Sequence, residues 1–257
     1  MNPVHQNAIL LGGVNYSESS RVIWLLTPEF GRQSLLVKGA RRPRSKYLGN
    51  LETFNLVRVI YRKGERSTLF TLREIDVLDH FGGIRKSLDA FWAASEAVEL
   101  VKAVSEEEQE SQALFELLRT FLTVADKYNK DTGALKLFLL AFRWRLVSIL
   151  GMAPRLVECL RCHRKPSRAP SYRFLLVEGG ILCPDCGKEA PASEQGYNLL
   201  SYQALRFVYR STKSFPSSAD RLLRLESGEF EQLEGLTTRY LSYHLGDHPA
   251  FRAESKS

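Results

Sequence analysis

Four cysteines in two C-x-x-C pairs constrain this chain more than any other feature of its sequence. The first pair is Cys159 and Cys162, the second is Cys183 and Cys186, and these four are the only cysteines in the sequence. A two-residue gap lets both sulfurs of one turn face the same ion, and two such turns supply the four thiolates of a tetrahedral Zn²⁺ site. The spacing therefore predicts one structural zinc ion, with no position left for a reacting water.

Disulfides and an iron–sulfur cluster are the other uses of four such cysteines. No signal-like apolar stretch follows the first five residues, which favours a reducing cytoplasm, where disulfides are rare. An iron–sulfur cluster also accepts four thiolates, but the short polar turns and Gly187 after the second pair are more typical of a zinc ribbon. The Gly179-Gly180 pair lies between two apolar runs and predicts a hairpin that leads into the second cysteine pair.

The charge of the chain is positive and unevenly distributed. With 257 residues the chain is expected to form more than one domain, and a net charge of +7 with a pI near 9.3 favours a polyanionic partner such as nucleic acid. Residues 1–80 contain 12 Lys and Arg against 7 Asp and Glu, whereas residues 81–158 contain 10 against 11. The positive field therefore belongs mainly to the N-terminal segment. No stretch of the sequence has the length and apolarity of a membrane span.

The N-terminal segment has the pattern of β-structure. Five short apolar runs, at residues 8–11, 22–26, 34–37, 54–61 and 68–72, are separated by turn signals. Five antiparallel strands in about 80 residues predict a small closed barrel, for which an OB-fold is the commonest solution. An SH3-like barrel is the structural alternative.

The longest connection of this predicted barrel is strongly basic. Between the third and fourth strands, five cations stand among the nine residues 38–46, next to an aromatic residue. Such a loop suits contact with the phosphates of a nucleic acid strand, although a solvated loop would have the same composition. The residues predicted to contact the phosphates of a nucleic acid are Arg21, Arg32, Lys38, Arg41, Arg42, Arg44 and Lys46.

Three aromatic rings, Tyr16, Phe30 and Tyr47, fall in predicted turns or loops, where an exposed ring can stack on a base. Tyr47 is the first candidate because it adjoins the cations.

From residue 84 onward the apolar period changes to that of helices. Helices are predicted over residues 84–104, 110–128, 132–150, 201–211, 218–225 and 230–245. The third is apolar nearly all round and is expected at the centre of a bundle. On it, Lys136 and Arg143 are seven residues apart and share a face. They are either ordinary rim charges or the cationic edge of a groove for an acidic, apolar peptide.

The sequence contains none of the common catalytic motifs. It has no phosphate-binding G-x-x-x-x-G-K-[ST] loop, no H-E-x-x-H helix and no G-x-S-x-G elbow, and its five histidines are scattered. The chain is therefore expected to bind rather than to catalyse.

Several of these segments together resemble the bacterial recombination mediator RecO family. They are the run Ser19-Ser20-Arg21-Val22-Ile23-Trp24-Leu25-Leu26-Thr27-Pro28-Glu29-Phe30-Gly31, then Lys38-Gly39-Ala40-Arg41-Arg42, then Ser45-Lys46. The later order, with a helical middle followed by two inserted cysteine pairs, is similar as well. The likeness covers essentially the whole chain.

The resemblance implies a DNA repair and recombination function. It implies an OB-fold that binds single- and double-stranded DNA, anneals complementary strands, and works with RecR to place RecA on strands coated by single-stranded DNA-binding protein. It also implies no catalytic residue, a location at the nucleoid in the cytoplasm, and docking of the acidic tail of single-stranded DNA-binding protein, for which Lys136 and Arg143 are the candidates. An OB-fold and zinc-ribbon protein of RNA metabolism is the alternative.

The predicted architecture is α+β and multidomain, with an embedded four-cysteine zinc ribbon. Its parts are an OB-fold domain at residues 1–80, a helical domain at residues 81–158, the ribbon at residues 159–190, a second helical part at residues 191–246 and a polar tail at residues 247–257.

Overall fold

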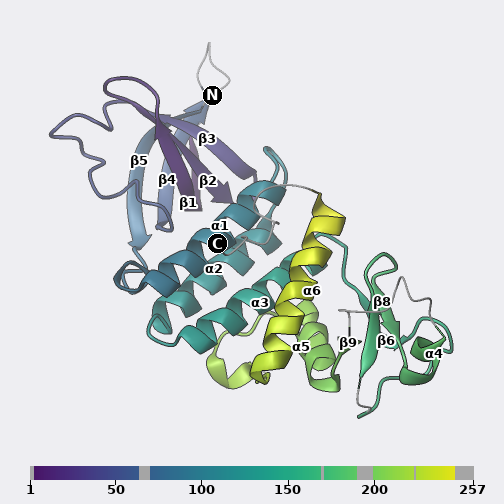
Figure 1. Cartoon of the computed structure of the whole chain (residues 1–257). Coiled ribbons are helices and arrows are strands. Elements are labelled where there is room, and N and C mark those ends of the chain that lie inside the picture. The colour runs from purple at the N-terminus through teal and green to yellow at the C-terminus, as the bar shows by residue number, and fades with distance from the viewer. Residues whose placement is uncertain (1–2, 64–69, 169–170, 190–198, 223, 247–257) are drawn as a thin grey trace. The chain divides into compact units, whose positions relative to one another are not determined.

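A computed structural model describes residues 3–63, 70–168, 171–189, 199–222 and 224–246 of the chain (Figure 1). The chain forms two compact units, Met1–Leu135 and Lys136–Ser257. The boundary falls inside a helix, so the helices of the predicted helical body are divided between the two units. The predicted polar tail at residues 247–257 lies outside the described residues.

Five strands of the first unit form a closed barrel (Figure 1). They are β1 (Val4–Asn15), β2 (Arg21–Thr27), β3 (Gly31–Val37), β4 (Leu56–Lys63) and β5 (Phe70–Asp79). The order around the barrel is β1, β2, β3, β5, β4, in which β3 and β5 pair in parallel and the other neighbours are antiparallel. This five-stranded closed barrel confirms the predicted OB-like domain.

Alternation along the strands fills the barrel. Along β3, for example, Gly31, Gln33, Leu35 and Val37 are buried and the residues between them are half-buried, because successive side chains of a strand point to opposite faces. The buried cluster consists of Ala8, Leu10, Ile23, Leu25, Leu35, Val37, Tyr47, Leu51, Val57, Val59, Tyr61, Leu72 and Ile75. Two of its members lie between β3 and β4, so that long connection is partly built into the core.

The turn between β2 and β3 holds the barrel to the segment that joins the first two long helices. Gly31 has a φ of +61°, which favours glycine, and a Cβ at this position would lie 2.4 Å from the carbonyl oxygen of Glu106. The backbone N–H of Arg32 donates to that same oxygen at 3.0 Å, and the N–H of Ser111 donates to the carbonyl of Pro28 at 2.9 Å. A side chain at residue 31 would therefore force the two segments apart.

We expect Gly31→Ala to lower the free energy of unfolding by about 2 kcal/mol or more, because it adds a backbone clash to the strain of a left-handed conformation. Gly49→Ala is the matched control, since Gly49 has a φ of +78° but no atom within 4 Å of an added Cβ. It should cost roughly 1 kcal/mol, the backbone term alone. Urea denaturation of the two variants measures the difference, and equal losses would contradict the close approach.

The helices of the first unit follow the barrel in sequence. They are the short 3₁₀ helix η1 (Ile84–Lys86), α1 (Leu88–Val104) and α2 (Gln112–Lys127). The predicted helix over residues 84–104 is divided because the Ser87 hydroxyl accepts a hydrogen bond from the Ala90 N–H and caps α1. Asp126 on α2 accepts the N–H of Gly83 at 2.6 Å and that of Ile84 at 3.2 Å, which fixes η1 to α2.

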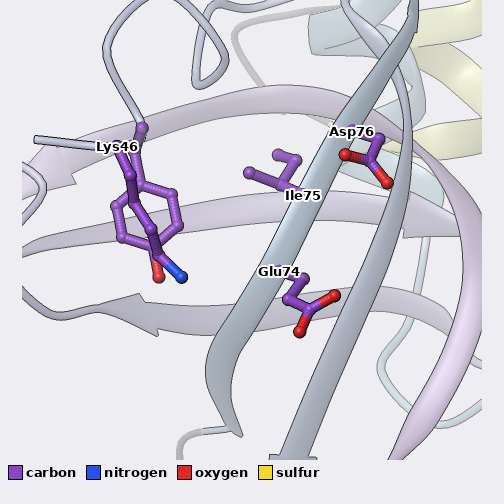
Figure 2. A pocket seen from close by; sticks show the side chains of 5 residues that line it. Lys46, Glu74, Ile75 and Asp76 are labelled. Atoms are coloured by element: carbon purple, nitrogen blue, oxygen red, sulfur yellow. The ribbon is translucent and has the colours of Figure 1, made fainter.

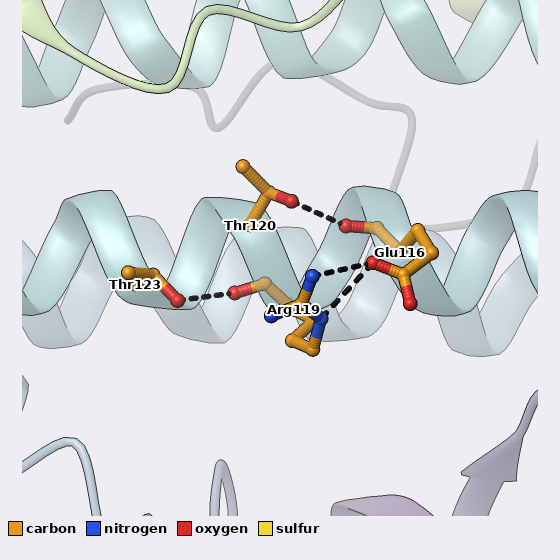
Figure 3. A network of polar contacts seen from close by, with 4 residues as sticks. All are labelled: Glu116, Arg119, Thr120 and Thr123. Carbon is orange, nitrogen blue, oxygen red and sulfur yellow. Dashed lines mark hydrogen bonds and ion pairs between the residues drawn. The ribbon is translucent and has the colours of Figure 1, made fainter.

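One face of α2 is polar and forms its contacts within the helix (Figure 3). Arg119 donates through Nε and Nη2 to Oε2 of Glu116, at 3.0 and 2.6 Å. The hydroxyls of Thr120 and Thr123 donate to carbonyl oxygens one turn earlier, those of Glu116 and Arg119. A half-exposed ion pair of this kind stabilises a helix by only about 0.3–0.5 kcal/mol, so this face is a solvated surface.

The second unit contains most of α3 (Thr132–Ile149), then α5 (Tyr202–Lys213), the 3₁₀ helix η3 (Ala219–Arg221) and α6 (Ser227–Leu245). Trp144 of α3 lies at the centre of its core, with its ring 5.3 Å from that of Tyr240 on α6 and 6.4 Å from that of Phe174. Burial of residues on all sides of α3 fits its apolar sequence. None of the helices that the structure describes is long and apolar enough to cross a membrane.

The predicted helix over residues 218–225 is wrong. Among the described residues 218–222 and 224–225 only η3 forms, closed by hydrogen bonds from the N–H groups of Arg221 and Leu222 to the carbonyls of Ser218 and Ala219. None of its residues is buried. A helix this short is not stable unless it packs on a neighbour, so without buried side chains the segment forms a single turn.

The segment with the cysteines forms a four-stranded sheet and a short helix. The strands are β6 (Arg155–Cys159), β7 (Tyr172–Leu175), β8 (Gly180–Leu182) and β9 (Leu199–Leu200), in the order β6-β8-β7-β9, and α4 (Pro184–Lys188) follows β8. The antiparallel pairing of β7 and β8 forms the predicted hairpin around Gly179-Gly180. The sheet begins at Arg155 and is completed at Leu200, so it extends beyond the predicted ribbon limits of 159 and 190.

Candidate metal centre and nucleic-acid interface

The four cysteines converge on one point of the second unit. Cys159 ends β6, Cys162 follows in the next turn, Cys183 comes directly after β8, and Cys186 lies in α4. Their four Sγ atoms all lie within 4.8 Å of one another, and those of Cys162 and Cys183 are 3.7 Å apart. This separation is far longer than a disulfide bond of about 2.05 Å. The fold therefore brings together the complete ligand set that the sequence predicts.

The sulfur geometry suits a tetrahedral ion. Four sulfurs at about 2.3 Å from a zinc ion are separated by roughly 3.8 Å along each edge of the tetrahedron, close to the observed 3.7 Å. The N–H of Cys183 donates to Sγ of Cys159 at 3.3 Å, and the N–H of His163 donates to the carbonyl of Cys159 at 3.0 Å. These bonds fix the first turn with its sulfurs directed inward, which is the arrangement of a closed structural site.

The thiols differ in acidity. Burial by itself raises the pKa of Cys159, but hydrogen bonds from the backbone of Cys162, Cys183 and Arg161 outweigh it and lower the pKa to about 6. Side-chain hydrogen bonds with Cys183 and Cys162 raise the pKa of Cys186 to about 12. A cation at the centre would favour the thiolate form of all four cysteines, because its positive charge offsets their negative charges.

Two arginines link the cysteine turns across the site. Nη1 of Arg164, after the first pair, lies 2.7 Å from Oδ2 of Asp185 in the second, and this contact raises the pKa of Arg164. Nη1 of Arg161 donates to the carbonyl of Cys186 at 3.3 Å. Both Arg164 and Asp185 are two-thirds exposed, so their ion pair orients the turns more than it stabilises them.

The basic loop, residues 38–47, is ordered by its own turns and by the barrel. The N–H of Arg42 donates to the carbonyl of Gly39 at 3.2 Å, and that of Ser45 donates to Arg42 at 3.0 Å. All five of its cations are exposed. Nζ of Lys46 donates to the carbonyl of Arg73 on β5 at 3.0 Å. The loop therefore presents a dense group of cations from a fixed backbone.

Arg41 joins the basic loop to the turn between β1 and β2. Its N–H donates to the carbonyl of Ser19 at 3.1 Å, and its Nη1 donates to the carbonyl of Ser17 at 2.8 Å. Arg21, the first residue of β2, pairs with Val37 at the end of β3 and is half-buried. The start of the basic loop, the β1–β2 turn and Arg21 thus share one end of the barrel.

Arg32 lies elsewhere. It is the second residue of β3, six residues before Lys38, so the strand places it roughly 20 Å from the start of the basic loop. Its Nη1 donates to the carbonyl of Lys102 at the C-terminal end of α1, at 3.2 Å. Of the seven predicted phosphate ligands, the structure gathers the other six at one end of the barrel and leaves Arg32 with the helices.

The expected exposure of Tyr47 is wrong. Only 8% of the residue is exposed, it belongs to the barrel core, and its hydroxyl donates to the carbonyl of Arg73 at 3.3 Å. Beside it lies a small pocket of about 160 Å³, lined also by Lys46 and by residues of β5. In Figure 2 Ile75 is directed toward the side of β5 on which Lys46 lies, and the carboxylates of Glu74 and Asp76 are directed away. The ring is buried because it closes the barrel, and it has no open face for a base.

Lys136 and Arg143 differ in their surroundings on α3. Lys136 is exposed, whereas the side chain of Arg143 is only 13% exposed and its Nη1 lies 3.9 Å from Oε1 of Glu234 on α6. The nearby Arg145 donates to the carbonyls of Thr212 and Lys213 at the end of α5. The predicted cationic rim is therefore partly neutralised from within its own unit.

Comparison with known proteins covers both units. Residues 1–81 match the family described as "Recombination protein O N terminal", and residues 85–251 match "Recombination protein O C terminal". The chain belongs to the RecO family. Among similar RecO proteins, "DNA repair protein RecO" of Anaeromyxobacter sp. (strain K) is 32% identical over 252 residues, which are 98% of this chain and 95% of the relative. "DNA repair protein RecO" of Desulfatibacillum aliphaticivorans is 29% identical over 97% of this chain and 95% of its own.

The aromatic residues predicted in turns of this RecO chain differ in exposure from the order that the sequence suggested. Of the three rings predicted in turns, Tyr16 is 63% exposed and Phe30 is 38% exposed, whereas Tyr47 is buried. A local signal for the burial of Tyr47 exists, because Leu51 four residues later is buried with it. The cations beside Tyr47 favoured a role in base stacking, whereas the four-residue spacing between Tyr47 and Leu51 favoured a place in the core.

Proposed function

We propose that this chain is a recombination mediator that binds single- and double-stranded DNA through its barrel and anneals complementary strands. Membership of the RecO family places the chain in DNA repair and recombination. The observation that carries the DNA-binding proposal is the group of five exposed cations on one ordered loop of an OB-like barrel. Such a loop neutralises phosphates without reading bases, so the expected binding depends on salt and not on sequence.

The proposal extends to partners and to the metal. With RecR, the chain would help to place RecA on strands coated by single-stranded DNA-binding protein, acting without catalysis at the nucleoid. We infer that the ion of the cysteine site is Zn²⁺, because four thiolates in two closed turns are the donor set of structural zinc. The ion would hold the two turns together and leave the barrel to contact the strand.

Binding and annealing assays test this function against the RNA alternative. We expect the chain to bind a 30-nucleotide single-stranded DNA in fluorescence anisotropy and to accelerate the annealing of that strand to its complement. The same measurement with RNA of identical sequence is the comparison. Tighter binding of RNA, with no acceleration of DNA annealing, would favour the OB-fold and zinc-ribbon protein of RNA metabolism instead.

A second surface is proposed for the tail of single-stranded DNA-binding protein. That tail is acidic and ends in apolar residues, so it needs cations beside an apolar slot. Lys136 and Arg143 supply two cations on one face of α3, although Glu234 partly offsets Arg143. We expect the double variant Lys136→Glu and Arg143→Glu to abolish binding of the isolated tail peptide in calorimetry, while binding of bare DNA remains nearly unchanged.

The variant Glu234→Gln is the control for this prediction. It removes the charge that faces Arg143, so peptide binding should be retained or become tighter. If the doubly reversed protein binds the peptide as well as the parent does, the tail docks elsewhere.

A further inference from the structure

Tyr16 is the most exposed aromatic residue of the barrel domain among the residues that the structure describes. It is 63% exposed, and Val14, two residues earlier on β1, is 48% exposed, whereas Leu10 on the same strand is fully buried in the barrel core. Exposed apolar side chains that stand singly are common on proteins and by themselves indicate nothing. The position of Tyr16 and Val14 relative to the basic loop is the observation that suggests a binding role.

The backbone of the turn that carries Tyr16 is fixed. The N–H of Tyr16 donates to the carbonyl of Ser20 at 3.0 Å, which extends the β1–β2 ladder by one further bond. The two hydrogen bonds from Arg41 to Ser17 and Ser19 then tie this turn to the basic loop. A ring and a group of cations, far apart in sequence, are therefore held at the same end of the barrel.

The other candidate rings lie in the wrong places for this end of the barrel. Phe30 lies in the turn between β2 and β3, at the end of β3 remote from the basic loop. Tyr47 is in the core. Of the three, only Tyr16 has an exposed ring in a turn that is hydrogen-bonded to the basic loop.

Single-strand binding needs both kinds of group. Cations follow the phosphates, and aromatic faces stack on bases, which a duplex keeps inside its own stack. Glu18 lies in the same turn and would repel a phosphate placed directly on it, which favours contact of this turn with a base. We propose that the ring of Tyr16 stacks on an unpaired nucleobase of a strand whose phosphates are held by the basic loop.

This inference rests on the proposed DNA binding, and the experiment separates the two. Tyr16→Ala should weaken binding of single-stranded DNA roughly tenfold, the contribution of one stacked base, with an unchanged salt slope because no phosphate contact is lost. Tyr16→Phe should bind like the parent, since it keeps the ring. Tyr243→Ala, which removes a ring 51% exposed on α6, is the matched control and should have no effect.

An abasic strand gives the decisive comparison. The parent should bind an abasic oligonucleotide more weakly than the ordinary strand, and Tyr16→Ala should lose nothing further on it. Equal binding of the ordinary strand by Tyr16→Ala and the parent would overturn the stacking proposal, and so would an equal loss on abasic and ordinary strands. If the parent itself binds no single-stranded DNA, it is the proposed function that fails.

Discussion

Replacing Cys159 and Cys183 with serine is expected to release one zinc ion per chain and to destabilise the second unit. Each residue comes from a different cysteine pair, and both are buried, at 1% and 4% exposure, so the double variant leaves neither turn with two sulfurs. Structural zinc contributes its binding free energy directly to folding, about 10–16 kcal/mol in isolated zinc-finger peptides. Here the sheet strands and the core around Trp144 would retain part of the structure, so we expect a loss of several kcal/mol rather than complete unfolding.

Metal analysis by mass spectrometry, together with limited proteolysis, measures this result. His163→Ala is the matched control, because His163 lies beside a ligand and its side chain is 70% exposed, with Nδ1 3.2 Å from Glu158 and outside the sulfur cluster. That variant should keep its zinc and its resistance to protease. A parent protein purified without chelator that contains no zinc would refute the assignment of the metal.

Neutralising Arg41, Arg42 and Arg44 together is expected to weaken binding of single-stranded DNA across all sequences. If each cation meets one phosphate, the slope of log K against log salt falls by roughly 0.7 per contact, or about 2 in all. At about 0.1 M salt the same change corresponds to roughly a hundredfold loss of affinity. A loss shared by unrelated sequences would indicate phosphate contact, because these residues carry no base-specific arrangement.

Two further variants separate phosphate contact by the basic loop from disturbance of the loop's fold and from a general loss of positive charge. Arg42→Ala with Arg44→Ala leaves the bonds of Arg41 to the β1–β2 turn intact, and should lower the slope by about 1.4. A triple alanine variant at Arg206, Arg210 and Lys213 removes the same net charge from exposed positions on α5 and should change the slope little. If the loop variants match the parent in affinity and in slope, the basic loop is only a solvated surface.

The cysteine site and the barrel were predictable because their signals are local. A C-x-x-C turn places two sulfurs on one side of the backbone whatever surrounds it, and the hairpin between the pairs is encoded by two adjacent glycines. Alternation of apolar and polar residues marks the strands of the barrel in the same way. The prediction of a helix over residues 218–225 was wrong because a helix this short is stable only when it packs on a neighbour. None of residues 219–221 is buried, so no such packing supports it.

The sequence by itself determined that four cysteine sulfurs meet, that a small barrel forms and that its cations are concentrated in one loop. Only the tertiary structure decided which aromatic and cationic side chains are exposed to solvent and which are buried or paired. Tyr47 and Tyr16 are both aromatic residues of predicted loops, yet Tyr47 belongs to the barrel core and Tyr16 remains exposed in the turn to which Arg41 is hydrogen-bonded. Arg32 and Arg143 are likewise cations whose partners, the backbone carbonyl of Lys102 and the carboxylate of Glu234, are 70 and 91 residues away in the chain. The physical reason is that exposure and charge pairing depend on residues far apart in sequence, which only the packed fold brings into contact.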